Sequence, residues 1–347
     1  MNGGNPKMPN FSFIPFTVES TFTAANEIPE GVKMIQAPEI WEESRKGTGV
    51  VVAVIDSGCD VNHPDLKDRI IGKQNFAQGE GGVDDVTDYS GHGTHVAGTI
   101  AAAENNNGVL GVAPGAKLLI LKVMKRFQRN GQTVFGATNE SIAQALRYCV
   151  TWRGPNNERV RVVNMSLGGP EHDPELHKAV QEAVLSDILV VCAAGNEGDF
   201  NRGGDCSPVG DEFSYPGAYP EVVSVGAIGL DGKFPCFPNT NLEVDVVAPG
   251  VNILSTYTNP PYAKLSGTSM ASPHVAGAAA LLINWCEQKF GRPFTEPEIY
   301  AQLIKRTDAL GNDPKLEGNG LLILTGRCSA SSERSGLIET REPVLSR

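Results

Sequence analysis

Runs of consecutive apolar, largely β-branched residues recur along this chain, separated by segments rich in Gly, Pro, Asn and Asp. Such runs are typical of strands buried on both faces, as in a parallel sheet covered by helices. The clearest run spans residues 50–55 and is followed directly by Asp56. Further strands of this kind are expected at residues 117–123, 160–166, 188–194, 222–227 and 244–248.

The stretches between these runs have the pattern of helices. One helix is expected over about residues 173–186, with Asp173 as its N-cap, and another over about residues 295–307. A long apolar helix should begin close to Ser269, with Pro273 in its first turn, and run to about residue 282. Because strands and helices alternate, the crossovers should be right-handed. We predict an α/β fold with a doubly wound, mostly parallel twisted sheet and helices on both faces, in three layers.

Composition limits the size of the core and the range of partners. With 347 residues, of which 40% are apolar, the chain can bury one large core. We expect one main domain at residues 26–326, a polar extension at residues 1–25 and a loosely held tail at residues 327–347. The net charge of −11 argues against nucleic acid and against an anionic membrane as partners.

Two features indicate a cytoplasmic protein. The first residues lack the charged and apolar regions of a secretory signal, and no apolar run reaches transmembrane length. The seven cysteines are an odd number without framework spacing, which suits reduced thiols better than disulfides. Secretion followed by removal of a leader is the alternative.

Three polar residues lie where this pattern favours chemistry. Asp56 follows a buried strand, and open α/β sheets bind ligands at the carboxyl ends of their strands, although an Asp before Ser-Gly can also simply start a turn. His92 lies where turn residues give way to a helix of small residues. Ser269 lies where a tight turn meets the long apolar helix, so free backbone N–H groups should face its hydroxyl. A serine at such a place can also merely cap the helix.

The other histidines are less suited to a reactive role. His92 and His95 are three residues apart, but no Glu follows in the zinc-protease pattern and no pair of thiols is near, which argues against zinc. We expect His95 and His274 to pack within helices. His92 is therefore the candidate base.

Together these residues supply a nucleophile, a base and an acid that orients the base, as peptide hydrolysis by a serine requires. Asp56 in Asp-Ser-Gly, His92 in Gly-His-Gly-Thr-His-Val-Ala-Gly and Ser269 in Gly-Thr-Ser-Met-Ala-Ser-Pro-His resemble the three signature motifs of the subtilisin family, in that family's chain order. The resemblance covers roughly residues 29–323. It implies a subtilisin-like serine endopeptidase that cleaves proteins and peptides with broad specificity through an acyl-enzyme.

The resemblance also implies an oxyanion donor and a substrate cleft. Asn196, in Ala-Ala-Gly-Asn-Glu-Gly, matches the asparagine whose amide joins the Ser269 N–H in binding the oxyanion. The edge that pairs with an extended peptide and the first specificity pocket should consist of Ser166, Leu167, Gly168, Gly169, Ala193, Ala194, Gly195 and, at the pocket floor, Ser214. Two segments depart from the family pattern, a basic loop at residues 124–132 and an insertion at residues 199–206.

Calcium is implied in the same way. An Asn-rich loop and the Asp of His-Pro-Asp match the tight calcium site of the family, which takes carboxylate, amide and carbonyl oxygens. The ligand candidates are Asp65, Ala103, Asn105, Asn107 and Val109, with Asn26 a weaker one. A solvated Asn-rich turn is the alternative. A second, weaker cation site is expected near Gly217, Tyr219, Val222 and Asp245.

The amino-terminal extension contains one apolar patch. Phe13, Ile14, Pro15 and Phe16 resemble the Leu-Ile-Pro-Tyr/Phe motif of intracellular subtilisins. Such an extension is expected to lie across the cleft as an added strand, with Pro15 displacing the peptide bond from Ser269, so the enzyme would stay latent until the extension is cut. An unstructured tail is the alternative. The family also suggests a homodimer.

The preferred interpretation is an intracellular, calcium-stabilised endopeptidase of the subtilisin type. Three alternatives stay open at this point. They are a secreted subtilisin that has lost its leader, a catalytically silent peptide-binding module, and a hydrolase that acts on esters or lipids.

Overall fold

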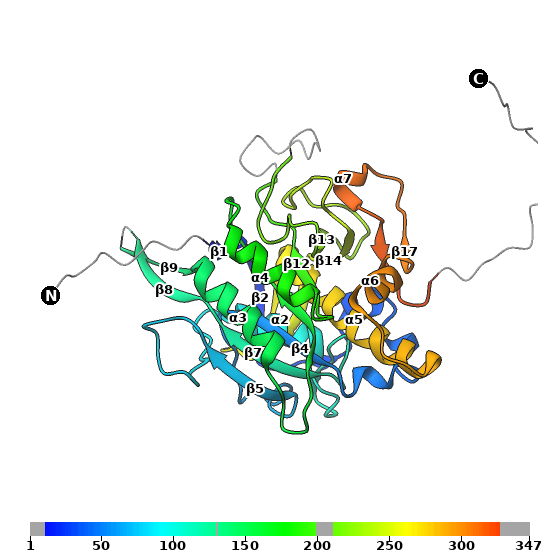
Figure 1. Cartoon of the computed structure of the whole chain (residues 1–347), viewed down its shortest axis with the longest axis horizontal. Helices are drawn as coiled ribbons and strands as arrows, with labels where there is room; N and C mark the ends of the chain where they lie inside the picture. Colours follow the sequence, from blue (N-terminus) through cyan, green and yellow to red (C-terminus); the bar gives the residue numbers. More distant parts are fainter. Residues whose placement is uncertain (1–10, 130, 199–210, 327–347) are drawn as a thin grey trace, which may run out of the picture.

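A twisted sheet forms the middle layer of the computed structural model, which describes residues 11–129, 131–198 and 211–326 (Figure 1). Within these residues the sheet has nine strands in the order β17-β18-β14-β13-β12-β10-β4-β7-β5, all parallel except the β17–β18 pair. The strands are β4 (Val51–Asp56), β5 (Ile70–Asn75), β7 (Lys117–Lys122), β10 (Val160–Met165), β12 (Leu189–Ala193), β13 (Val223–Ile228), β14 (Val246–Pro249), β17 (Thr307–Asp308) and β18 (Leu321–Leu322). The insertion at residues 199–206 and the tail at residues 327–347 lie outside the described residues.

Successive residues of a central strand point to opposite layers, which explains why the runs are continuously apolar. In β4, Val52 and Val54 belong to one hydrophobic cluster, whereas Val51, Ala53 and Ile55 belong to another. The first cluster contains α2 (His92–Ala101) and α5 (Thr268–Phe290), and the second contains α3 (Asn139–Thr151) and α4 (Pro174–Val184). The predicted three-layer α/β fold is therefore confirmed.

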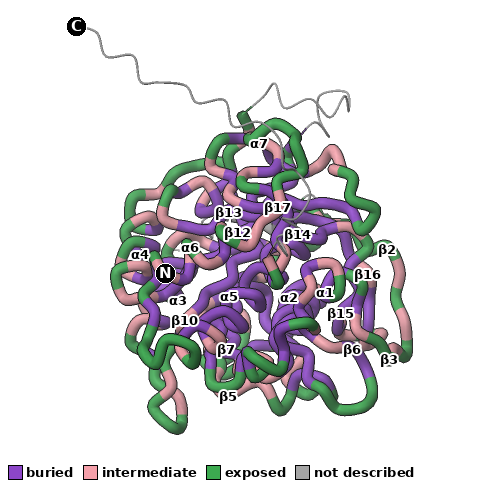
Figure 2. The backbone as a smooth tube through the Cα atoms, turned by 90° about the vertical axis from the view of Figure 1, so that its right-hand side faces the viewer, coloured by how far each residue is buried: buried purple, intermediate pink, exposed green. Residues whose placement is uncertain are grey.

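The remaining helices are shorter and lie around this centre. They are α1 (Glu30–Met34), α6 (Glu296–Ile304), α7 (Pro314–Glu317) and the 3₁₀ turns η1 (Pro38–Ile40) and η2 (Arg45–Gly47). Figure 2 shows that α2 and α5 are buried in the middle of the molecule, with exposed loops around them. None of the helices in the described part of the chain combines the length and apolar character that crossing a membrane requires.

The helix that carries Ser269 differs from its prediction. It continues past residue 282 to Phe290 and ends at Gly291, whose φ of 67° is favourable for glycine. Pro273 lies inside the helix and not in its first turn. Because proline has no N–H, it cannot donate to the carbonyl oxygen of Ser269, and the Ser166 hydroxyl donates to that oxygen instead, at 3.1 Å.

The amino-terminal segment joins two smaller sheets. β1 (Phe11–Phe13) lies between β11 (Leu167–Gly168) and β9 (Gln132–Ala137), and β9 pairs with β8 (Lys125–Arg129). The segment predicted as a basic loop is therefore largely a β-hairpin, which projects from one side of the molecule (Figure 1). β2 (Thr17–Phe22) pairs with β16 (Tyr262–Ser266), which pairs with β15 (Ile253–Thr256). β3 (Asn26–Glu27) pairs with β6 (Gly108–Val109).

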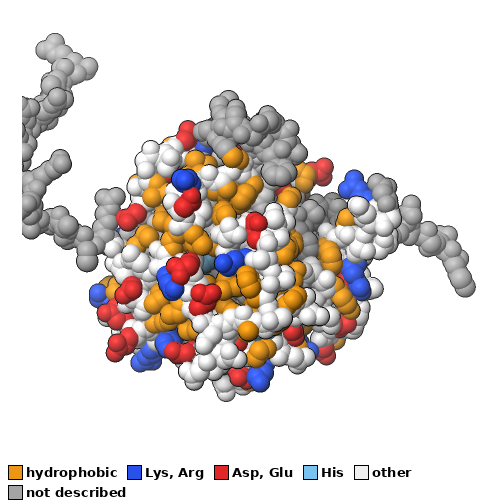
Figure 3. Space-filling view, turned by 180° about the vertical axis from the view of Figure 1, so that it is seen from behind, with side chains coloured by type: hydrophobic (Ala, Val, Ile, Leu, Met, Phe, Trp, Pro, Cys, Tyr) orange, Lys and Arg blue, Asp and Glu red, His pale blue; other side chains and the backbone are white. Residues whose placement is uncertain are grey.

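The cysteines only partly follow the prediction of reduced thiols. Cys59, Cys149, Cys192 and Cys286 are free and buried. Cys236, in contrast, is disulfide-bonded, so the prediction is wrong at that position. On the face shown in Figure 3, acidic, basic and apolar side chains are interspersed.

The N-cap of α4 allows a direct test of the helix assignment. Asp173 Oδ1 accepts a hydrogen bond from the Leu176 N–H at 2.8 Å, as predicted for an N-cap. We expect Asp173→Ala to lower the free energy of unfolding by about 1 kcal/mol, because that N–H loses its partner. Urea unfolding in a Ser269→Ala background, which prevents self-digestion, measures the change. The exposed neighbour Glu171, changed to Ala, is the control, and equal midpoints for both variants would contradict the assignment.

Candidate active site

The site lies at the carboxyl ends of β4 and β10, which are adjacent parallel strands in the middle of the sheet. From β4 the chain continues to β5 and β7 on one side, whereas from β10 it continues to β12, β13 and β14 on the other. Such a reversal of strand order leaves a crevice in which α/β sheets bind ligands. Asp56 is the last residue of β4 and therefore lies at the carboxyl end of a buried strand, as the sequence predicts.

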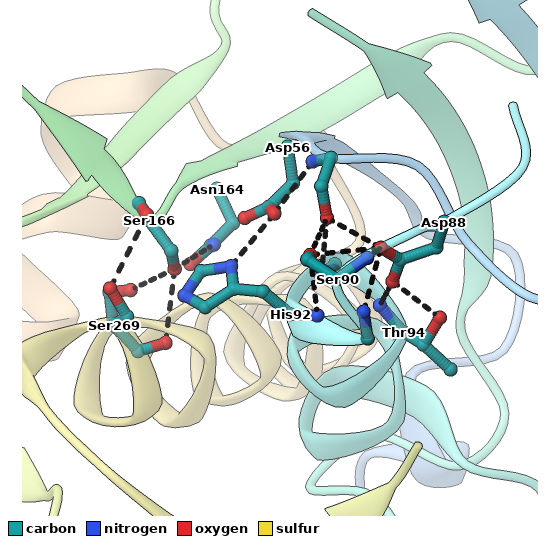
Figure 4. A network of polar contacts seen from close by, with 12 residues as sticks. Asp56, Asp88, Ser90, His92, Thr94, Asn164, Ser166 and Ser269 are labelled. Carbon is teal, nitrogen blue, oxygen red and sulfur yellow. Dashed lines mark hydrogen bonds and ion pairs between the residues drawn. The ribbon is translucent and has the colours of Figure 1, made fainter. Parts of the chain in front are cut away.

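The three predicted catalytic side chains are brought together. His92 is the first residue of α2, and its Nδ1 is 2.8 Å from Asp56 Oδ1, with both side chains buried. The Ser57 N–H donates to the same oxygen at 2.7 Å. In Figure 4 the imidazole of His92 lies between Asp56 and Ser269. The Ser269 hydroxyl donates to the carbonyl oxygen of Ser166 at 3.3 Å.

Asn196 lies beside Ser269 with its amide held in one orientation. Its Oδ1 accepts hydrogen bonds from the Thr268 N–H at 3.0 Å and from the Thr268 hydroxyl at 2.8 Å. Since both of these groups are donors, the oxygen end must face Thr268 and the NH₂ end must face the cleft. There Nδ2 donates to the carbonyl oxygen of Pro15 at 2.5 Å.

The other two predicted histidines are packed away from this chemistry. His95 Nε2 is 2.8 Å from the Ile253 carbonyl oxygen, and burial lowers the pKa of His95 to about 3. His274 Nδ1 is 2.8 Å from the Met270 carbonyl oxygen, and burial lowers the pKa of His274 to about 4. Both rings are therefore neutral near pH 7, as expected for packed histidines.

The predicted substrate edge is occupied by the chain's own extension. Leu167 and Gly168 pair with Phe13 and Ser12 of β1, and Ile14 is buried. A Cβ atom added to Gly168 would lie 2.2 Å from Ser214 Oγ and 3.4 Å from Ile14 Cγ1, so Gly168, Ser214 and Ile14 meet at one point. Ser214 therefore lies next to the part of the extension that contains Ile14.

Some of the predicted cleft residues have other contacts. The Ser166 side chain is completely buried, and its hydroxyl lies 2.9 Å from the Ser272 hydroxyl of α5. Gly169 pairs with Tyr215 and not with an extended peptide. Ala193 is the last residue of β12, and Ala194 and Gly195 follow it at the carboxyl edge of the sheet.

The residues predicted for the first calcium site also gather in one place. Asp65 is buried, and its carboxylate accepts from Asn105 Nδ2 at 2.8 Å and from the Val109 N–H at 3.0 Å. The Ala103 N–H donates to the Asp65 carbonyl oxygen at 2.8 Å, and the Asn107 N–H donates to Asn105 Oδ1 at 3.0 Å. Among the described residues no three His, Cys, Asp or Glu side chains form a metal-binding group. A cation here would therefore depend on amide and carbonyl oxygens around one carboxylate.

The second predicted cation site does not assemble in this way. Asp245 Oδ1 accepts from the Tyr300 hydroxyl at 2.6 Å, and Oδ2 accepts from the Ser224 N–H at 2.8 Å. Burial raises the pKa of Asp245 to about 6, because removal from water disfavours the charged carboxylate. Gly217, Tyr219 and Val222 are buried. The Tyr219 hydroxyl donates to the Asp173 carbonyl oxygen.

Comparison with known proteins agrees with this geometry. Residues 47–322 match the subtilase family model. The chain belongs to the subtilase family. It is 54% identical over 329 residues to the intracellular serine protease of Paenibacillus polymyxa, covering 94% of each chain. It is 48% identical over 328 residues to the major intracellular serine protease of Bacillus subtilis (strain 168), covering 94% of this chain and 97% of that one.

Similarity to subtilisin DY of Bacillus licheniformis is lower, at 41% identity over 260 residues, covering 75% of this chain and 86% of that one. These relationships make the protein a serine endopeptidase. The family resemblance implies the triad Asp56, His92 and Ser269, and the structure shows the Asp56–His92 hydrogen bond with Ser269 at the start of α5.

One functional residue of this subtilase was missed by the sequence analysis. Asp88 Oδ1 accepts from the Ser57 hydroxyl and from the Gly91 N–H, both at 2.9 Å. Its Oδ2 accepts from the N–H of Thr94 at 2.9 Å and from the Thr94 hydroxyl at 2.7 Å (Figure 4). Asp88 therefore ties the turn after Asp56 to the start of α2. An acidic residue just before a helix of small residues was the available signal.

Thr268 offers a test of how the amide of Asn196 is oriented. We expect Thr268→Val to lower kcat about tenfold with little change in KM, because Asn196 loses one of the two donors that hold it and the oxyanion is most strongly bound in the transition state. Peptide anilide hydrolysis, measured once the extension has left the cleft, gives both constants. Thr99→Val is the control, since that buried hydroxyl bonds only to the His95 carbonyl oxygen of its own helix. An unchanged kcat would refute the orienting role.

Proposed function

We propose that this serine endopeptidase is made in a latent form, with Asp56, His92 and Ser269 as its catalytic triad and residues 1–25 as an inhibitory extension. The observation that carries the proposal is the hydrogen bond of 2.5 Å from Asn196 Nδ2 to the Pro15 carbonyl oxygen. The extension thereby occupies the donor that a substrate's reacting carbonyl would use.

The geometry supports a specific role for each member of the triad. The Ser269 oxygen attacks the carbonyl carbon of the substrate while His92 Nε2 takes the hydroxyl proton. Asp56 orients the imidazole through Nδ1 and stabilises its positive charge, an effect that is strong because both side chains are buried. The oxyanion receives hydrogen bonds from Asn196 Nδ2 and from the Ser269 N–H. The imidazolium then gives its proton to the departing amine, and water releases the acyl group.

Three contacts support latency. β1 pairs on both of its edges, with β11 and with β9, which are the positions that a substrate strand would take. The Phe16 ring lies 4.7 Å from the His92 ring, between centroids, and so covers the base. The Ser269 hydroxyl is bonded to the Ser166 carbonyl oxygen and not directed at the extension. Pro15 also lacks the N–H that an ordinary substrate residue would offer.

Removal of the extension should therefore switch the enzyme on. The fully buried members of the two main hydrophobic clusters begin at Val32, and from the extension only Phe16 packs against them as a partly buried side chain. We expect a form that begins at Thr23 to exceed the full chain by about 100-fold in kcat/KM on a peptide anilide, because an attached segment competes at a high effective concentration. A full-chain Ser269→Ala variant controls for contaminating proteases. Equal activity of the two forms would rule out inhibition.

We also propose that calcium stabilises the fold at the Asp65 site. The support is chemical: the buried Asp65 carboxylate contacts Asn105 and Val109, and the adjoining loop has carboxylate, side-chain amide and carbonyl oxygens, which hard cations prefer as ligands. Asn26 lies alongside, because β3 pairs with β6, the strand that contains Val109. Calcium would there supply the positive charge that the buried carboxylate lacks.

Calcium removal gives a test that does not depend on activity. In a Ser269→Ala background, free calcium at about 100 times its Kd should add about 2.7 kcal/mol to the free energy of unfolding, seen as a higher Tm than in chelator. Asp65→Asn should abolish this response because it removes the ligand charge. The exposed Asp68, changed to Asn, is the matched control and should keep the response. Identical Tm values with calcium and with chelator would contradict the proposal.

Cytoplasmic location and homodimer formation complete the proposal. The names of the two relatives described above, both intracellular proteases, support the location, as do the four buried free thiols. The disulfide at Cys236 argues in the opposite direction, since cytosolic disulfides are rare. Homodimer formation rests on the family resemblance alone.

A further inference from the structure

Asn196, the proposed oxyanion donor, lies in irregular structure and depends on other parts of the chain for its position. It is the third residue after β12 ends at Ala193, and the residues from Ala194 to Gly198 belong to no helix or strand. Two hydrogen bonds from Thr268 hold the oxygen of its side chain. These bonds orient the amide, but they do not fix the main chain that carries it. The position of that main chain must come from another contact.

Asn239 makes this contact from a segment 42 residues further along the chain than Glu197. The Asn239 N–H donates to the carbonyl oxygen of Gly195 at 2.9 Å. Its side-chain Oδ1 accepts from the N–H of Glu197 at 2.7 Å. Asn196 lies between these two residues, so a single asparagine holds the chain on both sides of the oxyanion donor. Asn239 is almost fully buried, which makes both hydrogen bonds stronger than they would be in water.

Gly195 leaves the room that Asn239 needs. The φ angle of Gly195 is 114°, in the region that favours glycine. A Cβ atom added there would lie 2.1 Å from Asn239 Nδ2 and 2.5 Å from Glu197 Oε2. The amide of Asn239 therefore lies directly against the main chain just before Asn196, and a shift of one displaces the other.

The amide of Asn239 has only one possible orientation. The Glu197 N–H is a donor, so the side-chain oxygen of Asn239 must face it and Nδ2 must point the other way. Nδ2 is buried and has no hydrogen-bond partner within residues 11–129, 131–198 and 211–326. Because a buried donor without a partner lowers stability, stability alone would favour an apolar side chain here. The asparagine is better explained by what its oxygen holds.

The segment that contains Asn239 is itself anchored. Asn241 Nδ2 donates to the carbonyl oxygen of Glu212 at 2.6 Å, and the Asn241 N–H donates to the carbonyl oxygen of Lys315 at 3.2 Å. Both asparagines are almost fully buried. They therefore form a matched pair, in which Asn239 holds the residues around the oxyanion donor and Asn241 holds the support.

We propose that Asn239 is a positioning residue for peptide hydrolysis, which places Asn196 Nδ2 at the distance that the oxyanion requires. The proposal rests on the proposed function, because it takes Asn196 as the oxyanion donor. Asn239 acts through Gly195 and Glu197 and not through a contact of its own with the reacting atoms. Hydrogen bonds to the oxyanion are strongest in the transition state, and a small displacement of a preorganised donor weakens them. Loss of Asn239 should therefore slow the chemical step more than it weakens substrate binding.

A double-mutant cycle tests this coupling. Asn239→Ala, Asn196→Ala and the double variant are made as full-length chains, and a specific protease then removes the extension at a site introduced before Thr23. On a peptide anilide, kcat and KM are measured per folded protein, which near-UV circular dichroism quantifies. We expect Asn239→Ala to lower kcat about tenfold with little change in KM. It should lower kcat no further in the Asn196→Ala background, because the donor that it positions is then absent.

Asn241→Ala is the matched control, since it removes a buried asparagine from the same segment. It should lower the Tm about as much as Asn239→Ala does, measured in a Ser269→Ala background that prevents self-digestion. It should nevertheless leave kcat close to that of the parent. A general loosening of the segment would lower kcat equally in both variants, and that result would overturn the proposal.

Two further results would count against Asn239: an unchanged kcat in Asn239→Ala, and an equal loss of kcat with and without Asn196. The single variant Asn196→Ala separates these results from failure of the proposed function. Loss of an oxyanion donor lowers kcat by about 10² to 10³, a range whose reference case is itself a subtilisin, so an unchanged kcat there would refute the proposed function. If Asn239→Ala does not fold, Asn239→Ser, which keeps a polar side chain at the buried position, replaces it in the same cycle and should show the same coupling.

Discussion

The hydrogen bond between Asp56 and His92 is the interaction on which the rest of the site depends. Both side chains are almost fully removed from water, and a buried carboxylate is tolerated only where donors surround it. The Ser57 N–H and the imidazole are those donors. Asp88 then holds the start of α2 against the turn after Asp56, so the imidazole cannot leave the carboxylate without breaking a second buried network.

The position of Ser269 follows from how deeply α5 is packed. A Cβ added to Gly277 would lie 2.6 Å from Val112 Cβ, so this helix fits only because small residues face its neighbours. Pro273 has no N–H to donate to the Ser269 carbonyl oxygen. The hydroxyl of Ser166, which follows β10, donates to that oxygen instead. Ser269 is thereby linked to the end of β10, which pairs with β4, the strand that carries Asp56.

If the extension inhibits as proposed, one backbone surface serves both inhibition and catalysis. Its strands use main-chain hydrogen bonds on either side of the catalytic residues, and such bonds do not discriminate between the chain itself and a substrate. Discrimination lies in the three bridging residues, where Pro15 presents its carbonyl to Asn196 while Phe16 covers His92. An attached segment needs only moderate contacts, because its effective concentration is high.

The sequence by itself determined the fold class, the family and the candidates for the catalytic residues, because continuous apolar runs and short motifs carry that information locally. It did not reveal Asp88, the length of α5, the hairpin of β8 and β9, or the inward position of Ser166. Three of these depend on partners far away along the chain: Ser57 for Asp88, β1 for the hairpin and Ser272 for Ser166. The conformational preference of a residue does not depend on such distant partners, so only the packed tertiary structure decides these features.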